Sequence, residues 1–295
     1  MSVATTELSA SSRLFSSAVV RELGKTGRSG LLARLLDQSG VAAAMNSDAT
    51  VGEAFDRAFG QLRRLGNRDE YVYRTAIAQK ILLGRHNLRT ATMLGEARVG
   101  SSKADVVVFN GTSTAYEIKS ERDSLARLRS QVSAYARVFA AVNVVTSPSH
   151  VAQVLRQIPD GIGVLILTSR FTLKTERRAV TDSSRTDPLA ILDFVRVSEA
   201  FEILRGVGVE PPRVPNTQMR AALRNVFTDL EPGPVHDLMV STLKVTRSQR
   251  SAETYVQSIP MSLRAAMLTL RMDDASEQRL HDATRLPIGA ALAWR

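Results

Sequence analysis

The sequence contains no cysteine among its 295 residues. This absence excludes disulfides, thiolate zinc sites and iron–sulfur clusters, and it suits a protein that works in a reducing compartment. Long apolar runs are absent as well, since stretches such as residues 162–167 are far shorter than the roughly 20 residues of a membrane-spanning helix. The first residues, which include Glu7, do not resemble a secretory signal. We therefore expect a cytoplasmic protein without a membrane-spanning segment.

Aromatic residues make up only 5% of the chain, which argues against an extended platform for stacking single-stranded nucleic acid. Positive charge, by contrast, is in excess, because 39 Lys and Arg residues face 29 Asp and Glu residues and give a net charge of +10. Most of these cations are Arg, whose planar guanidinium group suits phosphate, although a GC-rich genome also favours Arg over Lys. The composition indicates an anionic partner such as nucleic acid, with a merely solvated basic surface as the alternative.

Several common catalytic motifs are missing. The four histidines, His86, His150, His236 and His281, are scattered without the spacing of a metal site. The segment Gly24-Lys25-Thr26 lacks the earlier glycine and the preceding strand of a phosphate-binding P-loop. No Gly-x-Ser-x-Gly elbow is present for acyl chemistry. Whatever chemistry the chain performs must come from other residue types.

The hydrophobic pattern changes twice along the chain. Residues 1–67 are helix-like, with Thr50 as a candidate N-cap and Gly66 as a candidate stop, and a further helix is predicted over 70–83. Then follow strands at 93–99, 104–109 and 112–119, a helix at 123–141, a strand at 142–146, a helix at 149–157 and a strand at 163–168.

Residues beyond about 170 are again helix-like, with one helix expected from Pro188 to Gly206 and linkers at 210–215 and 231–234. The order of helix, three strands, helix, strand, helix and strand predicts an α/β core. We therefore expect three domains: an N-terminal helical region at 1–67, a core at 68–170 and a C-terminal helical region at 171–295.

Charged residues occupy both strands of the hairpin that Asn110-Gly111 closes. Asp105 lies on its first strand, and Glu117 and Lys119 lie on its second, two residues apart and therefore on one face. A two-residue loop would put Asp105 on the opposite face, so we predict a three-residue loop. The predicted loop comprises residues 109–111, has Gly111 left-handed and pairs Val108 with Thr112.

In this register the opposite face of the hairpin is filled by Val106, Val108, Tyr116 and Ile118. Two carboxylates and an ammonium group then converge at the strand ends remote from the turn. The alternative is structural, with Asp105 and Lys119 forming an ion pair and Glu117 exposed at a strand edge.

These residues resemble the PD-(D/E)XK, or restriction-endonuclease-like, nuclease superfamily, which places an Asp on the second core strand and (D/E)xK on the third. Here Asp105 and the pair Glu117 and Lys119 match that motif, although Ala104 stands where the motif has proline. Gln131 and Tyr135 match the QxxxY element of some branches. The resemblance covers residues 68–170 and implies an αβββαβ core with a mixed sheet flanked by helices, extended by N- and C-terminal helices.

A closer likeness is to a bacterial family of this superfamily that is known mainly by a locus tag and has no settled function. It is carried by Tyr116-Glu-Ile-Lys-Ser120, Arg127-Leu128, Gln131 and Tyr135. It runs beyond the core in both directions with weaker motifs.

The resemblance implies a magnesium site, which manganese would also fill. Asp105 and Glu117 are the expected direct ligands, and Glu96 on the first strand is a direct or water-mediated third, because Mg²⁺ prefers oxygen ligands. Lys119 would orient the attacking water or stabilise the charge that develops on phosphorus. Gln131 and Tyr135 would hydrogen-bond Glu117, Lys119 or the DNA backbone, or would simply pack the helix on the sheet.

Five basic residues lie on or beside the same elements: Lys103, Arg122, Arg127, Arg129 and Arg137. They would hold phosphates of the substrate strand, or they form a solvated face paired with Glu121 and Asp123. We therefore expect a Mg²⁺-dependent nuclease acting on DNA. The alternative is a non-catalytic scaffold that binds nucleic acid or a protein, with a protein partner bound through the helical flanks.

Overall fold

The computed structural model describes residues 5–46, 48–270 and 272–294. The chain forms two compact units, one helical and one built on a sheet. The helical unit comprises the residues up to 83, residues 169–171 and the residues from 249 onward, and the sheet unit comprises residues 84–168 and 172–248. Within the described ranges, no helix combines the length and the apolar character needed to cross a membrane.

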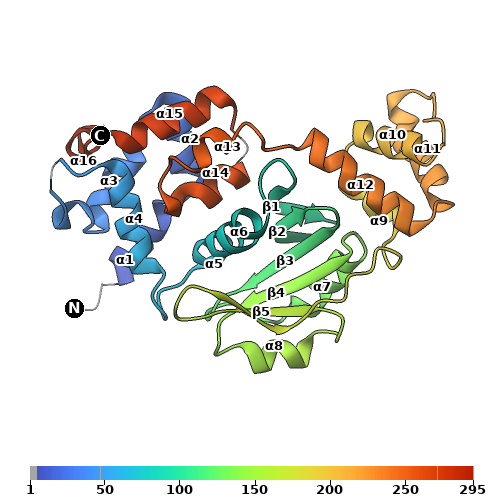
Figure 1. Ribbon diagram of the computed structural model, residues 1–295, viewed down its shortest axis with the longest axis horizontal. Coiled ribbons are helices and arrows are strands. Elements are labelled where there is room, and N and C mark those ends of the chain that lie inside the picture. The colour runs from blue at the N-terminus through green and yellow to red at the C-terminus, as the bar shows by residue number, and fades with distance from the viewer. Residues whose placement is uncertain (1–4, 47, 271, 295) are drawn as a thin grey trace. The chain divides into compact units, whose positions relative to one another are not determined.

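The helical unit is assembled from both ends of the chain. In Figure 1 the blue N-terminal helices lie among the orange and red C-terminal ones, and α15 packs against α2 and α4 while α16 packs against α3. Its helices are α1 (Thr5–Arg13), α2 (Ser17–Thr26), α3 (Gly30–Gln38), α4 (Val51–Leu62), α5 (Glu70–Ile77), α13 (Glu253–Val256), α14 (Arg264–Leu270), α15 (Asp274–Arg285) and α16 (Ile288–Leu292).

The helix α4 begins at the N-cap residue that the sequence predicts. Thr50 caps α4 and exchanges hydrogen bonds with Glu53, which satisfies amide groups that a helix start leaves free. Beyond α5 the helix continues as a π-helical stretch, Ala78–Leu82, and ends with α6 (Leu83–Arg85). The interior contains a group of aromatic rings from Phe15, Phe55, Phe59, Tyr71 and Phe171.

The sheet unit contains a six-stranded mixed sheet whose strands lie in sequence order. β1, β2 and β3 form an antiparallel meander, β3, β4 and β5 run parallel, and β6 returns antiparallel to β5. Parallel neighbours need a crossover, which α7 and α8 provide (Figure 1). The strands are β1 (Thr92–Val99), β2 (Ser102–Phe109), β3 (Ser113–Lys119), β4 (Ala141–Thr146), β5 (Gly163–Leu167) and β6 (Leu173–Arg177).

Helices flank this sheet and share one core with it. Their bounds are α7 (Leu128–Ala136), α8 (Val151–Gln157), α9 (Pro188–Phe194), α10 (Val197–Gly206), α11 (Asn216–Thr228) and α12 (Pro232–Thr246). The core runs from Val107, Ala115 and Val142 of the sheet through α7 to Phe227 of α11. The predicted order of helices and strands through β5 and the α/β class with a mixed sheet are confirmed.

The hairpin loop has the predicted length but not the predicted position. Phe109 pairs with Ser113 and Val108 with Thr114, so the loop is residues 110–112 rather than 109–111. The amide of Asn110 donates to the carbonyl of Thr112, and Gly111 adopts a φ of +115° that glycine tolerates. Moving the loop by one residue shifts the register by two, so Asp105 again comes next in register to Glu117.

Other elements differ from the sequence predictions. The strand β6 was not predicted, because Lys, Thr, Glu and Arg dominate an exposed edge strand and hide its pattern. The helix expected over 123–141 is the shorter α7, and the helix expected over 188–206 is interrupted at Val195, which is extended. The prolines in 231–234 do not form a linker but open α12, where a first turn accepts them.

The two compact units do not follow the boundaries expected at residues 67 and 170. The first helices of the chain share their unit with residues from 249 onward, while residues 172–248 belong with the sheet. Composition changes along the chain mark where helices and strands alternate. They carry no signal for which distant helices share a core.

Candidate active site

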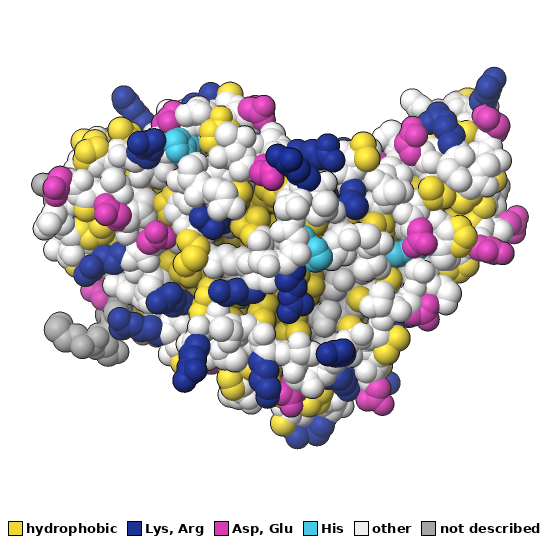
Figure 2. Space-filling model, viewed as in Figure 1, with side chains coloured by type: hydrophobic (Ala, Val, Ile, Leu, Met, Phe, Trp, Pro, Cys, Tyr) yellow, Lys and Arg dark blue, Asp and Glu magenta, His cyan; other side chains and the backbone are white. Residues whose placement is uncertain are grey.

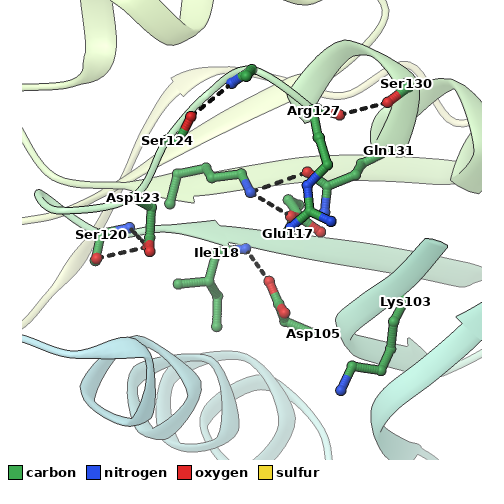
Figure 3. Close-up of polar contacts among 12 residues, drawn as sticks. Lys103, Asp105, Glu117, Ile118, Ser120, Asp123, Ser124, Arg127, Ser130 and Gln131 are labelled. Carbon is green, nitrogen blue, oxygen red and sulfur yellow. Dashed lines mark hydrogen bonds and ion pairs between the residues drawn. The ribbon is translucent and has the colours of Figure 1, made fainter.

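The centre of the candidate site is an ion pair between neighbouring residues of β3. The ammonium Nζ of Lys119 lies 2.8 Å from Oε1 of Glu117, and the two side chains are only 10% and 2% exposed. The same ammonium group donates to Oε1 of Gln131 on α7 at 3.1 Å (Figure 3). The alternation of a strand places residues 117 and 119 on one face, and α7 covers that face.

Asp105 joins this centre from β2 at a break in the sheet. The ladder between β2 and β3 ends with Val106 opposite Tyr116, so Asp105 comes next in register to Glu117. There, Oδ2 of Asp105 accepts a hydrogen bond of 2.6 Å from the backbone amide of Ile118 (Figure 3). The carboxylate therefore lies against the peptide that joins Glu117 to Ile118.

Tyr135 closes the site from α7. Its hydroxyl lies 2.8 Å from Oε2 of Glu117 and 2.8 Å from the carbonyl oxygen of Lys103, and the residue is completely buried. Burial and the nearby Glu117 carboxylate raise the pKa of Tyr135 well above its ordinary value, so the hydroxyl remains a donor. The expected contacts of Gln131 and Tyr135 with Lys119 and Glu117 are present.

Two groups in this network are backbone atoms, the Ile118 amide and the Lys103 carbonyl. The sequence did not predict either of them, because every residue has the same backbone groups and no residue type marks the ones that form such contacts. The available signal was indirect: a partly buried carboxylate beside a valine-rich strand needs a hydrogen-bond donor, and a neighbouring backbone amide can supply one.

Glu96, the expected third carboxylate, is engaged elsewhere. Its Oε2 lies 2.8 Å from Nζ of Lys103, and both side chains are more than half exposed, at 55% and 54%. Among the described residues, no three His, Asp or Glu side chains form a group ready to hold a metal ion. Asp105 and Glu117 lie on neighbouring strands, with the Asp105 carboxylate against the backbone amide that follows Glu117.

The five basic residues differ in their surroundings. Arg122, Arg127 and Arg129 are exposed on the loop before α7 and on its first turn, and Figure 3 shows the side chain of Arg127 extending toward Glu117 and Gln131. Arg137, at the other end of α7, forms an ion pair with Asp187. Asp123 accepts hydrogen bonds from Ser120. On the face in Figure 2, Lys and Arg side chains are spread among acidic and hydrophobic ones rather than gathered in one stripe.

The fold and the site define a mixed α/β protein with a buried carboxylate–ammonium pair and a second carboxylate at the point where β2 and β3 part. The family model described as bacteriophage P4 protein cII matches residues 63–270, which is more than half of the chain. The chain therefore belongs to the bacteriophage P4 protein cII family.

A curated relative and a solved structure are also similar. Protein cII of Enterobacteria phage P4 is 27% identical over 164 residues, and the match spans 53% of this chain and 60% of that protein. A protein of unknown function from Silicibacter pomeroyi has 17% sequence identity and a TM-score of 0.28, with 36% of this chain and 69% of that chain covered. The second similarity is too weak to define a fold.

Proposed function

We propose that this protein is a metal-dependent nuclease that hydrolyses phosphodiester bonds of DNA. The observation that carries the proposal is the hydrogen bond from the Ile118 amide to Asp105, because it holds this carboxylate beside the ion pair of Glu117 and Lys119. Two carboxylates and an ammonium group would then meet at one point of the sheet. This is the set of groups that phosphoryl chemistry needs to hold a cation and to stabilise charge on phosphorus.

The order of elements also supports the proposal. A helix, the meander of β1, β2 and β3, the helix α7 and the strand β4 follow each other in the order of the αβββαβ core of PD-(D/E)XK nucleases, which this chain resembles. Asp105 lies on the second strand of the meander and Glu117 and Lys119 lie on the third, as that motif requires. We propose a restriction-endonuclease-like core on this basis.

The donor set suits Mg²⁺, with Mn²⁺ as a substitute. Asp105 and Glu117 would hold the ion through carboxylate oxygens, and water and a substrate phosphate would complete an octahedral site. The bound ion would activate water and neutralise charge on the phosphate. One oxygen of Asp105 accepts the Ile118 amide and each oxygen of Glu117 has one partner, so an ion would bind through their remaining lone pairs, with Lys119 sharing or releasing Oε1 of Glu117.

Lys119 has a place prepared for it after that release. Gln131 accepts a hydrogen bond from its ammonium group and would keep it beside the reacting phosphate, where a fixed positive charge stabilises the transition state. Tyr135 would hold the second oxygen of Glu117 and prevent the carboxylate from rotating. On this proposal Gln131 holds the side chain of Lys119 in place, and Tyr135 holds that of Glu117.

Exposed cations around the site support DNA as the partner. Arg122, Arg127 and Arg129 would contact phosphates, which gives affinity that is independent of base sequence and falls with salt. Lys103 and Arg137 are weaker candidates because ion pairs with Glu96 and Asp187 already neutralise them. The net charge of +10 favours the approach of any nucleic acid.

Cleavage assays test this proposal. Plasmid, short duplex and single-stranded DNA are incubated with Mg²⁺ or Mn²⁺ and with the wild type, Asp105→Ala or Lys119→Ala. We expect cleavage by the wild type and a loss of at least about a hundredfold in both variants, the usual scale when a group that stabilises transition-state charge is removed. Lys174→Ala, which removes an exposed lysine of β6, serves as the control and retains activity. Equal activity of the wild type, Asp105→Ala and Lys119→Ala would overturn the assignment.

A second candidate function is favoured by the burial of Glu117, which is 2% exposed and has both oxygens occupied. On this hypothesis the three charged residues only stabilise a scaffold that binds nucleic acid, or a protein partner through the helical flanks. Calorimetric titration separates the two functions. Mn²⁺ binding that Glu117→Ala abolishes supports the nuclease, whereas DNA binding that is indifferent to metal supports the scaffold.

A further inference from the structure

Within the described ranges, three glutamates are almost completely removed from water. Glu117, Glu199 and Glu277 are 2%, 1% and 3% exposed. The first has the ammonium group of Lys119 as its partner, and the second has the guanidinium group of Arg247. Buried carboxylates keep their charge through such partners, because a cation replaces part of the water that burial removes. Glu277 differs from the other two, since it forms no ion pair with any described residue.

Glu277 lies on the packed face of α15. Leu280 and Thr284 on the same helix are also buried, and the helix packs against α2 and α4 (Figure 1). The Oε2 atom of Glu277 is buried and has no hydrogen-bond partner among the residues that the structure describes. Such a site favours the neutral acid, because the ionised form would lose its water without gaining a donor.

The charged neighbours of Glu277 on its own helix do not offset this burial. Asp274 and Asp273 lie one turn before it, and both oppose a further negative charge. His281 lies one turn after it, and its Nδ1 is 3.2 Å from Oδ1 of Asp282. The first turn of α15 therefore adds like charge and no cationic partner.

The helices packed against α15 supply no partner either. Arg279 of α15 extends toward α2, where its Nε donates to the carbonyl oxygen of Gly24 at 2.6 Å rather than to a carboxylate. The other helices in contact with α15 are α4 and α13. None of the titratable residues on these three helices forms an ion pair with Glu277 in the described chain: Arg21, Glu22 and Lys25 of α2, Glu53, Asp56 and Arg57 of α4, and Glu253 and Tyr255 of α13.

Burial, with a smaller effect of Asp274 and Asp273, raises the pKa of Glu277 from its ordinary value of 4.5 to about 7. Above pH 4.5 the unfolded chain therefore releases a proton that folded Glu277 retains. The contribution of this carboxyl to stability is present below about pH 4.5, and it is lost as the pH rises toward about 7.

We propose that Glu277 is a pH-sensitive switch in the helical unit: α15 docks on α2 and α4 while this carboxyl is neutral, and the docking loosens when it ionises. Loosening would expose Leu280 and Ala283, the buried apolar residues of α15. The switch does not depend on the proposed nuclease function, because Asp105, Glu117 and Lys119 belong to the other unit.

Hydrogen exchange of the full chain, followed by mass spectrometry between pH 5.5 and 8, tests the proposal. The proteins are the wild type, Glu277→Gln and Asp282→Asn. Glu277→Gln keeps the size of the side chain and cannot ionise. Asp282→Asn is the matched control, because Asp282 is an exposed carboxylate of the same helix whose pKa is already lowered by hydrogen bonds from Gln278 and His281. Ratios of exchange rates at one pH remove the intrinsic effect of pH on amide exchange.

We expect the rate in α15 of the wild type, divided by that of Glu277→Gln, to rise by at least about tenfold between pH 5.5 and 8. The linkage of one proton changes an opening equilibrium by up to about tenfold for each unit of pH. The same ratio for α7 of the sheet unit should stay constant. Asp282→Asn should follow the wild type at every pH.

A constant ratio in α15 across this pH range would overturn the proposal. If Glu277→Gln does not fold, a ¹³C NMR titration of the Glu277 carboxyl in the wild type decides instead. A midpoint well above 4.5 supports the switch, and a midpoint near 4.5 refutes it.

Discussion

Glu117 and Lys119 bury opposite charges side by side, with side-chain exposures of 2% and 10%. Removing two charges from water costs about as much free energy as their attraction returns, so stability alone does not account for such a pair. The hydroxyl of Tyr135 donates a hydrogen bond to Oε2 of Glu117, and the ammonium group of Lys119 donates one to Oε1 of Gln131. Removing one charge of such a pair is costly, because the other charge stays buried without its partner.

We therefore predict that Lys119→Met lowers the free energy of unfolding by about 3–5 kcal/mol, because it leaves the Glu117 carboxylate buried without its partner. The double variant Glu117→Gln with Lys119→Met should recover most of this loss. Urea unfolding of the wild type, the two single variants and the double variant measures the coupling. Additive effects of the two substitutions would show that the residues do not act as a pair.

The residues of the site were predictable because the charges of a hairpin are close in sequence as well as in space. Glu117 and Lys119 could be assigned to one face from strand alternation, and Asp105 could be added only through the predicted length of the hairpin loop. Gln131 and Tyr135 could be paired from helical spacing. The left-handed Glu96 and the contact of Asp105 with a backbone amide could not be predicted, since both depend on how three strands part.

At the scale of elements, α12 is fastened to the start of β3 by a buried polar network. Nε2 of His236 lies 2.7 Å from Oγ of Ser113, which also accepts the amide of Ala140, and Nδ1 of His236 lies 2.9 Å from Oδ1 of Asp237. Burial lowers the pKa of His236 below its ordinary value of 6.5, and Asp237 offsets this only in part. The docking of α12 thus depends on a neutral imidazole.

We predict that the stability contributed by His236 is lost as the pH falls below about 6.5, because the unfolded state then binds a proton that folded His236 resists. Above that pH the contribution of His236 is fully present. Urea unfolding between pH 5 and 8 measures the slope, and His236→Gln should flatten it. His281→Gln, on α15 of the helical unit, is the control and should keep the wild-type slope. Identical slopes for the wild type and His236→Gln would contradict the prediction.

Elements were predicted well where one pattern covers a whole segment and poorly where polar residues interrupt it. The central strands β2, β3 and β4 were predicted to within two residues at each end. The charged edge strand β6 was missed, and the break between α9 and α10 was overlooked because apolar residues continue across Val195. A strand that is buried on both faces has a continuous run of apolar residues, which is easy to recognise in the sequence. An exposed edge strand or a short break in a helix has no such run.

At the scale of the whole molecule, the two units are built from different parts of the chain. The sheet unit draws on nearly continuous sequence, while the helical unit needs α13 to α16 to cover the helices at the start of the chain. The association of α15 with α2 and α4 joins segments that the whole sheet unit separates in sequence. Periodicity within one helix cannot reveal such a partnership, which is why the domain boundaries expected from sequence differ from these units.

We predict that residues 84–248 fold alone and unfold cooperatively, because the core that one face of the sheet shares with α7 and with α9 to α12 lies entirely within them. Residues 1–83 alone should not unfold cooperatively, whereas residues 1–83 joined to 249–295 by a Gly/Ser linker should. Circular dichroism during thermal unfolding compares the three fragments. A cooperative transition in 1–83 alone, with the midpoint of the joined fragment, would contradict this prediction.

Because the helical unit combines both ends of the chain, it also determines which unit can fold first during synthesis. A ribosome releases α1 to α5 long before α13 to α16 exist, so the early helices leave the exit tunnel with the faces that α14, α15 and α16 will cover still open to water. The sheet unit, whose residues emerge in between, can fold first. For that interval the nascent chain presents apolar helix surface to chaperones and proteases, and translation speed beyond Ser248 determines how long the interval lasts.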